Sequence, residues 1–146
     1  MPDLSALEAL YREVVLEHYR NPRHRAPLAA PSAEASVANP ICGDQVSVQV
    51  ALTGEGGERI EEISSRARGC SIAVAAGSVM TELVRGRTRA EARALGAELA
   101  RVVRGDSPGE GLDRRLAAFA RVAALPSRQR CATLAWEALE EALAKG

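Results

Sequence analysis

The sequence predicts an α+β domain in which a small antiparallel sheet of two to three strands packs against about five α-helices. Two observations support this class. The runs 45–52 and 59–68 alternate apolar and polar residues, less regularly in the second, and the glycine-rich segment 53–57 between them is typical of a hairpin turn. After residue 70 the apolar positions instead follow the helical period. A chain of 146 residues can bury a core of its own, so we expect a single domain over 1–146.

The other elements are predicted in chain order from their spacing and end signals. Apolar residues recur at helical spacing over 4–19, and Asn21-Pro22 ends this first helix. The proline-rich stretch 22–40 predicts a loop or an edge strand. Further helices are expected on one side of the sheet, over 71–85, from Thr88 to Val103 with a capping box at Thr88 and Glu91, near 113–124, and from Pro126 onward.

The composition argues against several classes of partner. Lysine plus arginine and aspartate plus glutamate each number 19, so the net charge of zero favours neither nucleic acid nor an anionic membrane. Two tyrosines, one tryptophan and one phenylalanine are too few to stack nucleic-acid bases. We find no signal peptide and no apolar run long enough to cross a membrane. Three cysteines, an odd number, then indicate a reducing compartment, and we expect a cytoplasmic protein.

The three cysteines lie far apart, and each has an ordinary packing explanation as well as a chemical one. Cys42 and Asp44 would point the same way in an extended strand but about 6.6 Å apart, so they share a site only if the chain curls at Gly43. Cys70 begins a predicted helix, where the helix dipole favours the thiolate. Cys131 borders the apolar stripe of the last helix. Taken singly, Cys42 and Cys131 are better explained as buried free cysteines, whereas for Cys70 the two explanations balance.

Taken together, the three thiols and the Asp44 carboxylate make a tetrahedral ligand set suited to zinc, copper(I) or an iron–sulfur cluster. The paired Cys-x-x-Cys knuckles of zinc fingers are absent. One oxygen among three sulfurs indicates a ligand held less tightly, as in a site that exchanges something. Arg128 or Arg130 could balance the negative charge of such a site.

Four segments, spread over the chain in order, resemble the U-type iron–sulfur cluster assembly proteins, SufU and its relative IscU. These segments are Leu10-Tyr11-Arg12-x-Val14-x-x-x-His18-Tyr19-x-Asn21-Pro22-Arg23, Asn39-Pro40-x-Cys42-Gly43-Asp44, Gly69-Cys70-Ser71-Ile72-Ala73 and Arg128-x-x-Cys131-Ala132-x-Leu134-x-Trp136. Arg130 stands where IscU-type members have histidine, and the stretch from Thr88 to Ser107 is an insertion of the SufU type. Leu125-Pro126 is similar to the IscU chaperone-recognition segment, but the residues after it depart from that segment. The resemblance is therefore to the SufU-like branch.

The resemblance implies a fold, a ligand set and a partner. Cys42, Asp44, Cys70 and Cys131 correspond to the metal ligands, with zinc as the expected ion and a transient iron–sulfur cluster as the alternative. Cys42 corresponds to the acceptor of persulfide sulfur from a cysteine desulfurase, and Arg128 to an arginine that assists at the site. Other assembly proteins or apoprotein clients would receive the sulfur. As an enzyme, the protein would be at most a zinc-dependent sulfurtransferase.

Three other hypotheses compete with the zinc-bound sulfur acceptor. A scaffold on which a cluster is built and transferred would use the same four ligands. A purely structural zinc site fits less well, because the core does not need it and closed structural sites favour Cys and His over Asp. A cysteine hydrolase would need His18 or His24 as its base, yet no histidine adjoins a cysteine and His18 falls on an apolar helix face. The arginine-rich edge at Arg85, Arg87, Arg89 and Arg93 is interpreted as a solvated helix face.

Overall fold

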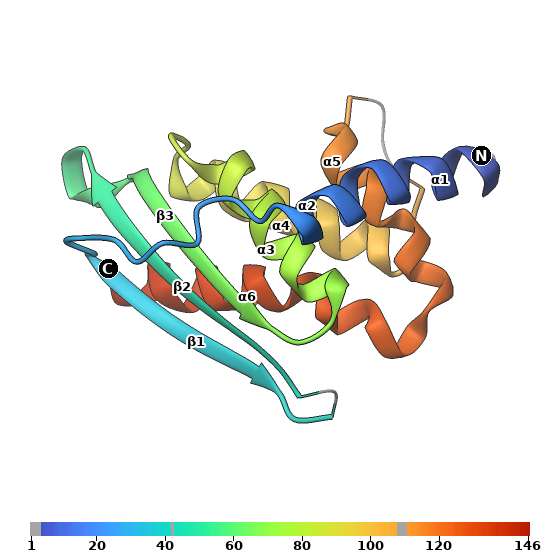
Figure 1. Ribbon diagram of the computed structural model, residues 1–146. Coiled ribbons are helices and arrows are strands. Elements are labelled where there is room, and N and C mark those ends of the chain that lie inside the picture. Colours follow the sequence, from blue (N-terminus) through green and yellow to red (C-terminus); the bar gives the residue numbers. More distant parts are fainter. Residues whose placement is uncertain (1–3, 42, 108–110) are drawn as a thin grey trace.

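The computed structural model describes residues 4–41, 43–107 and 111–146 and has the predicted α+β architecture (Figure 1). Three antiparallel strands form one sheet in the order β1-β2-β3. They are β1 (Ala33–Asn39), β2 (Asp44–Thr53) and β3 (Arg59–Arg68). The hairpin between β2 and β3 is as predicted, and the proline-rich stretch ends in the edge strand β1.

The alternation in β2 determines which face of the sheet is covered. Val46, Val48 and Val50 are fully buried, and the polar residues between them point to the opposite face. Register places Asn39 opposite Asp44 at the tight end of the β1–β2 pair. The same register places Gln45 opposite Arg68, so the start of β2 and the end of β3 lie side by side. This end of the sheet carries the residues of interest below.

The helices occur where the periodicity predicts them, with local changes in geometry. The first helical stretch contains α1 (Leu4–Tyr11), a π-helical turn (Arg12–Leu16) and α2 (Glu17–Arg20). After the sheet come α3 (Ser71–Val84), α4 (Arg89–Val103), α5 (Arg114–Ala117) and α6 (Gln129–Lys145). The expected helix near 113–124 is one α-turn followed by a 3₁₀ segment over Ala118–Ala124. A further 3₁₀ turn, Pro126–Arg128, leads into α6.

Two helices cover the apolar face of the sheet, as expected for helices on one side (Figure 1). Helix α6 packs along β1 and β2, and α3 packs beside it on β3. The stripe predicted for the last helix is buried throughout, at Ala132, Ala135, Trp136, Leu139, Ala142 and Leu143. The opposite face is crossed by the segment after α2, where the Leu28 N–H donates to Gln49 Oε1 at 2.8 Å.

Helix α4 begins with the predicted capping box. The Glu91 N–H donates to Thr88 Oγ1, and the Thr88 N–H donates to Glu91 Oε1, at 3.1 and 2.9 Å. These two bonds satisfy backbone donors that a helix start otherwise leaves to solvent. None of the helices in the described part of the chain combines the length and apolar character needed to cross a bilayer.

Candidate metal centre

Asp44 is positioned by a tight turn at the end of the β1–β2 pair. The Gly43 N–H donates to the Asn39 carbonyl at 2.9 Å, and the Ile41 N–H donates to the Asn39 side chain at 3.2 Å. Gly43 has φ +77°, a conformation that glycine adopts without strain, so the predicted curl at this residue is present. Asp44 is only 1% exposed. Cys42, expected as a ligand and as the sulfur acceptor, lies outside the described residues.

Gly69 brings the end of β3 against the Asp44 carboxylate. Its φ is +133°, and a Cβ atom at this position would lie 1.9 Å from Asp44 Oδ1 and 2.9 Å from Asp44 Cα. No larger residue fits without moving Asp44 or the backbone. The close approach lets the next residue, Cys70, donate its N–H to Asp44 Oδ1 at 2.9 Å and place its Sγ 3.4 Å from Oδ2.

Cys70 is the N-cap residue of α3, as the sequence predicted from the helical period that follows it. Its backbone is extended, with φ −72° and ψ 163°, and its carbonyl accepts the Val74 N–H at 3.2 Å. The thiol is half-buried, at the positive end of the α3 dipole. The same dipole stabilises the Asp44 carboxylate, which caps the Cys70 N–H. Asp44 and Cys70 thus both lie at the positive end of the α3 dipole.

Cys131 reaches the cluster from the first turn of α6 and is fully buried. One ligand atom each from Asp44, Cys70 and Cys131 lies within 4.8 Å of the other two. Residues far apart in the chain, from β2, α3 and α6, thus converge on one point. Of the four expected ligands, these three are described and come together.

Arg128 supplies positive charge to this cluster, whereas Arg130 forms an ion pair elsewhere on its own helix. The negative charge of the Cys70 thiolate, followed by hydrogen bonds to Cys131 and Cys70, raises the pKa of Arg128 above its usual value. Arg130 pairs with Glu137, two turns further along α6, at 3.2 Å. Among the described contacts, Arg128 is the arginine that lies beside Cys70 and Cys131.

Tyr11, at the end of α1, also borders the cluster, although sequence reasoning did not identify it as a site neighbour. Burial, then the Cys70 thiolate charge, raises the pKa of its phenol, while Arg121 and Arg128 act in the opposite direction. The sequence feature that could have identified Tyr11 is its place in the opening motif. Helical spacing alone predicts only that Tyr11 faces the core. Tyr11 is thus close enough to Cys70 and Arg128 for their charges to act on it.

The three described ligands fit a thiophilic ion such as zinc. An ion about 2.3 Å from sulfur and about 2.1 Å from oxygen in tetrahedral geometry separates the two ligand atoms by about 3.6 Å. The Cys70 Sγ–Asp44 Oδ2 distance of 3.4 Å already matches this separation. The ligand atoms of the three residues lie at most 4.8 Å apart, so a small rotation of a side chain brings all of them to the separation that one ion requires. Two soft sulfurs and one carboxylate oxygen also match the ligand preferences of zinc.

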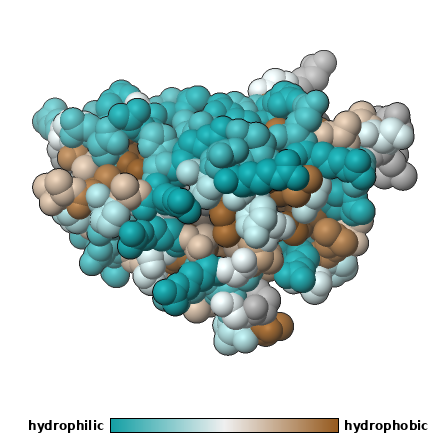
Figure 2. All heavy atoms as spheres, in the orientation of Figure 1, coloured by the Kyte–Doolittle hydropathy of each residue, from teal (hydrophilic) through white to brown (hydrophobic). Residues whose placement is uncertain are grey.

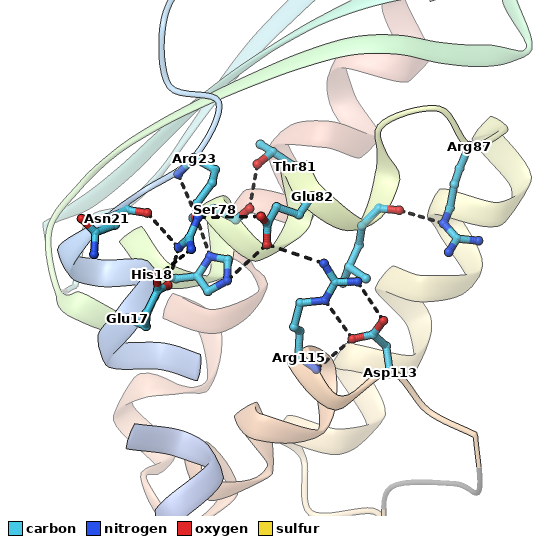
Figure 3. A network of polar contacts seen from close by, with 11 residues as sticks. Glu17, His18, Asn21, Arg23, Ser78, Thr81, Glu82, Arg87, Asp113 and Arg115 are labelled. Carbon is cyan, nitrogen blue, oxygen red and sulfur yellow. Dashed lines mark hydrogen bonds and ion pairs between the residues drawn. The ribbon is translucent and has the colours of Figure 1, made fainter. Parts of the chain in front are cut away.

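The histidines do not take part in this cluster among the described residues. His18 is buried between α2 and α3, with Nδ1 2.7 Å from Ser78 Oγ and Nε2 3.3 Å from Glu82 (Figure 3). Arg23 and Arg115 also approach Glu82, at 3.7 and 3.5 Å, so His18 belongs to a polar network that joins α2, α3 and α5. The expectation of a satisfied core histidine is confirmed. His24 has φ +50° and its carbonyl accepts the Ser65 N–H. A cysteine–histidine hydrolase thus finds no support here.

The fold and the cluster define a small α+β protein whose sheet end and two helices converge on thiols and a carboxylate. The chain belongs to the NifU-like N terminal domain family, whose model matches residues 10–145. This is a family of iron–sulfur cluster assembly proteins, scaffolds and sulfur acceptors among them.

One relative described as a sulfurtransferase and one described as a scaffold are both similar to the chain over most of its length. It is 33% identical to the "Zinc-dependent sulfurtransferase SufU" of Bacillus subtilis, over 95% of this chain and 92% of that protein. It is 37% identical to the "Iron-sulfur cluster assembly scaffold protein IscU" of Streptococcus pyogenes, over 96% and 86%. A NifU-like protein structure from Brucella abortus superposes with a TM-score of 0.84 at 24% identity, covering 95% of each chain, which supports the fold.

Proposed function

We propose that this protein accepts persulfide sulfur from a cysteine desulfurase and passes it to iron–sulfur cluster assembly, with zinc held by Cys42, Asp44, Cys70 and Cys131. The observation that carries the proposal is the convergence of Asp44, Cys70 and Cys131 within 4.8 Å, beside Arg128. The likeness to a protein described as a zinc-dependent sulfurtransferase supports zinc and sulfur transfer over most of the chain's length.

Each described residue has a distinct task in this proposal. Asp44 is held by the Cys70 N–H and offers a carboxylate oxygen in a buried position. Arg128 places a positive charge and hydrogen-bond donors beside Cys70 and Cys131. Bound zinc would keep the sulfurs ionised and protect them from oxidation. A site of this kind stores reactive thiolates in a defined place.

The sulfur transfer is a thiol–disulfide exchange. The Cys42 thiolate attacks the terminal sulfur of the donor's persulfide and forms a new S–S bond. The S–S bond within the donor breaks, and the donor cysteine leaves as a thiolate. One sulfur atom moves with no net gain or loss of electrons, so no further oxidant or reductant is needed. Arg128, beside the cluster, would stabilise the negative charge that passes between the sulfurs.

Metal and acid-labile sulfide content per chain tests this proposal, on protein purified without oxygen and without added metal. We expect about one zinc and no sulfide, with zinc lost on Cys→Ala replacement at Cys42, Cys70 or Cys131. The Arg93→Ala variant is the matched control and should keep its zinc, because Arg93 pairs with Glu140 on the α4–α6 side of the molecule. Iron with matching sulfide would instead favour the cluster scaffold, the function named for the Streptococcus pyogenes relative. Absence of any metal would refute the proposal.

A further inference from the structure

A hollow of about 660 Å³ lies along β3, between this strand, the segment after α2 and the start of α3. Its walls come from the segment after α2, the end of β3 and the first turn of α3, and include Pro22, Arg25, Arg66, Arg68 and Val74. Arg68 precedes Cys70 by two residues, and Val74 donates its N–H to the Cys70 carbonyl. The hollow therefore shares the end of β3 and the start of α3 with the candidate metal centre, although Asp44, Cys70 and Cys131 do not line it.

Three arginines of this hollow, Arg25, Arg66 and Arg68, are named the basic rim. All three are exposed, and within the described residues none has a carboxylate oxygen within 4 Å of its charged group. Arg66 donates Nε–H to the Arg25 carbonyl at 3.1 Å, which ties β3 to the segment after α2. The basic rim thus gathers three arginines that lack a carboxylate partner in the described part of the chain around the end of β3, the strand that leads into Cys70.

Many arginines elsewhere on the surface form ion pairs. Four others also have no carboxylate partner among the described residues, namely Arg20, Arg59, Arg89 and Arg104. Along the edge that the sequence singled out, Arg85 pairs with Glu62 at 2.5 Å and Arg93 pairs with Glu140 at 2.8 Å. The chain has as many acidic as basic residues, so partners for arginine are not scarce. Like charges that gather without internal partners raise the local potential and attract an oppositely charged surface.

An apolar side chain lies on the other flank of the cluster. Ile41, at the tip of the turn between β1 and β2, is 94% exposed and adjoins Cys42 in the sequence. This turn projects from the lower edge of the molecule, with hydrophobic atoms at its tip (Figure 2). Because Asp44 contacts both Gly69 and Cys70, the turn and the end of β3 flank the same point. An apolar anchor beside charged groups is typical of a protein interface.

We propose that the basic rim and Ile41 form the docking surface for an acidic face of the sulfur donor, an inference that rests on the proposed function. Carboxylates of the donor would pair with Arg25, Arg66 and Arg68, since guanidinium groups bind carboxylates through two parallel hydrogen bonds. Ile41 would insert into an apolar pocket of the donor. Contact on both flanks would orient the donor's persulfide toward the cysteine cluster.

Sulfur acceptance from a persulfide-loaded cysteine desulfurase of the same organism, measured against donor concentration at low and high salt, tests this inference. The variant Arg25→Glu/Arg66→Glu/Arg68→Glu should raise the KM for the donor about ten-fold at low salt, while the maximal rate stays unchanged. The difference should shrink to about two-fold or less near 0.5 M salt, where exposed charges are screened. Ile41→Ser should raise the KM at both salt concentrations, because apolar contacts are not screened.

Two controls keep the result interpretable. Arg104→Glu changes the charge in the same direction at an exposed residue at the end of α4 that does not line the hollow, and should leave the KM unchanged. Arg25→Glu/Arg68→Glu spares the Arg66 bond and guards against a local folding defect, which unchanged zinc content and circular dichroism would also exclude.

The possible failures are distinguishable. If the unmodified protein accepts no sulfur, the proposed function is wrong. If it accepts sulfur and the basic-rim variants match Arg104→Glu at low salt, the docking surface is wrong although the function stands. Altered self-association of the variants with an unchanged KM would mean that the surface binds a second copy, which also overturns the inference.

Discussion

Replacing Gly69 by alanine tests how the candidate metal centre is assembled, because this glycine lets β3 approach Asp44. The new Cβ atom would lie 1.9 Å from Asp44 Oδ1, 2.6 Å from its Cγ and 2.9 Å from its Cα. The last contact involves backbone, so rotation of the Asp44 side chain alone does not relieve it. The φ of +133° is unfavourable for alanine in addition.

The expected cost has two parts. Holding a non-glycine residue in a sparsely populated backbone conformation costs about 1–3 kcal/mol. Forcing extra volume into a packed site costs about 1–3 kcal/mol more. The sum, about 2–6 kcal/mol, corresponds to a fall in Tm of roughly 7–20 °C for a chain of this size. Displacement of Asp44 should also weaken zinc binding.

Thermal unfolding followed by circular dichroism, together with zinc competition against a chromophoric chelator, measures both effects. Gly86→Ala is the matched control, because Gly86 has φ +83° but a Cβ atom added there would meet nothing within 4 Å. It should lose only about 1 kcal/mol through backbone strain and keep its zinc affinity. If Gly69→Ala is no less stable than Gly86→Ala and binds zinc equally well, the contact between Gly69 and Asp44 does not hold the site.

Three further predictions concern charge, pH and capping. Arg128→Ala should slow sulfur acceptance about ten-fold through loss of a charge-assisted hydrogen bond, and Arg93→Ala should not, as single-turnover transfer would reveal. Burial first, then Arg23, lowers the pKa of His18, so the unfolded chain binds more protons below about pH 7. The free energy of unfolding should therefore decrease between about pH 7 and pH 5, less so in His18→Gln, and urea titrations showing equal slopes would contradict this. Thr88→Ala should destabilise the protein by about 1 kcal/mol without changing its metal content, which urea unfolding and metal analysis would measure.

Local patterns carried most of the secondary structure. The alternation of Val46, Val48 and Val50 predicted the buried face of β2, because side chains in a strand point to opposite faces in turn. Thr88 and Glu91 predicted the start of α4 to the residue, since both capping bonds lie within one turn. The helix near 113–124 was less well predicted: apolar spacing does not distinguish an α-helix from the 3₁₀ segment that follows Ala117.

The candidate site was predictable in its members but not in its electrostatics. The chemistry of thiols and a carboxylate indicated that Asp44, Cys70 and Cys131 belong together, and the family resemblance supported the same set. Arg128 and Arg130 are the same residue type two positions apart, so the sequence does not show which of them approaches the sulfurs. In the structure Arg128 lies beside Cys70 and Cys131, and Arg130 pairs with Glu137. Tyr11 resembled an ordinary core residue because helical spacing contains no information about what lies opposite.

By itself, the sequence determined the order and extent of the main strands and helices, the ligand chemistry and the family, because these depend on neighbouring residues and on residue type. Only the tertiary structure decided that Gly69 packs against Asp44, that Arg128 faces the sulfurs, and that Arg25, Arg66 and Arg68 line one hollow without carboxylate partners among the described residues. Those features join residues from separate elements. Their distances follow from how the sheet and helices pack, which no local pattern encodes.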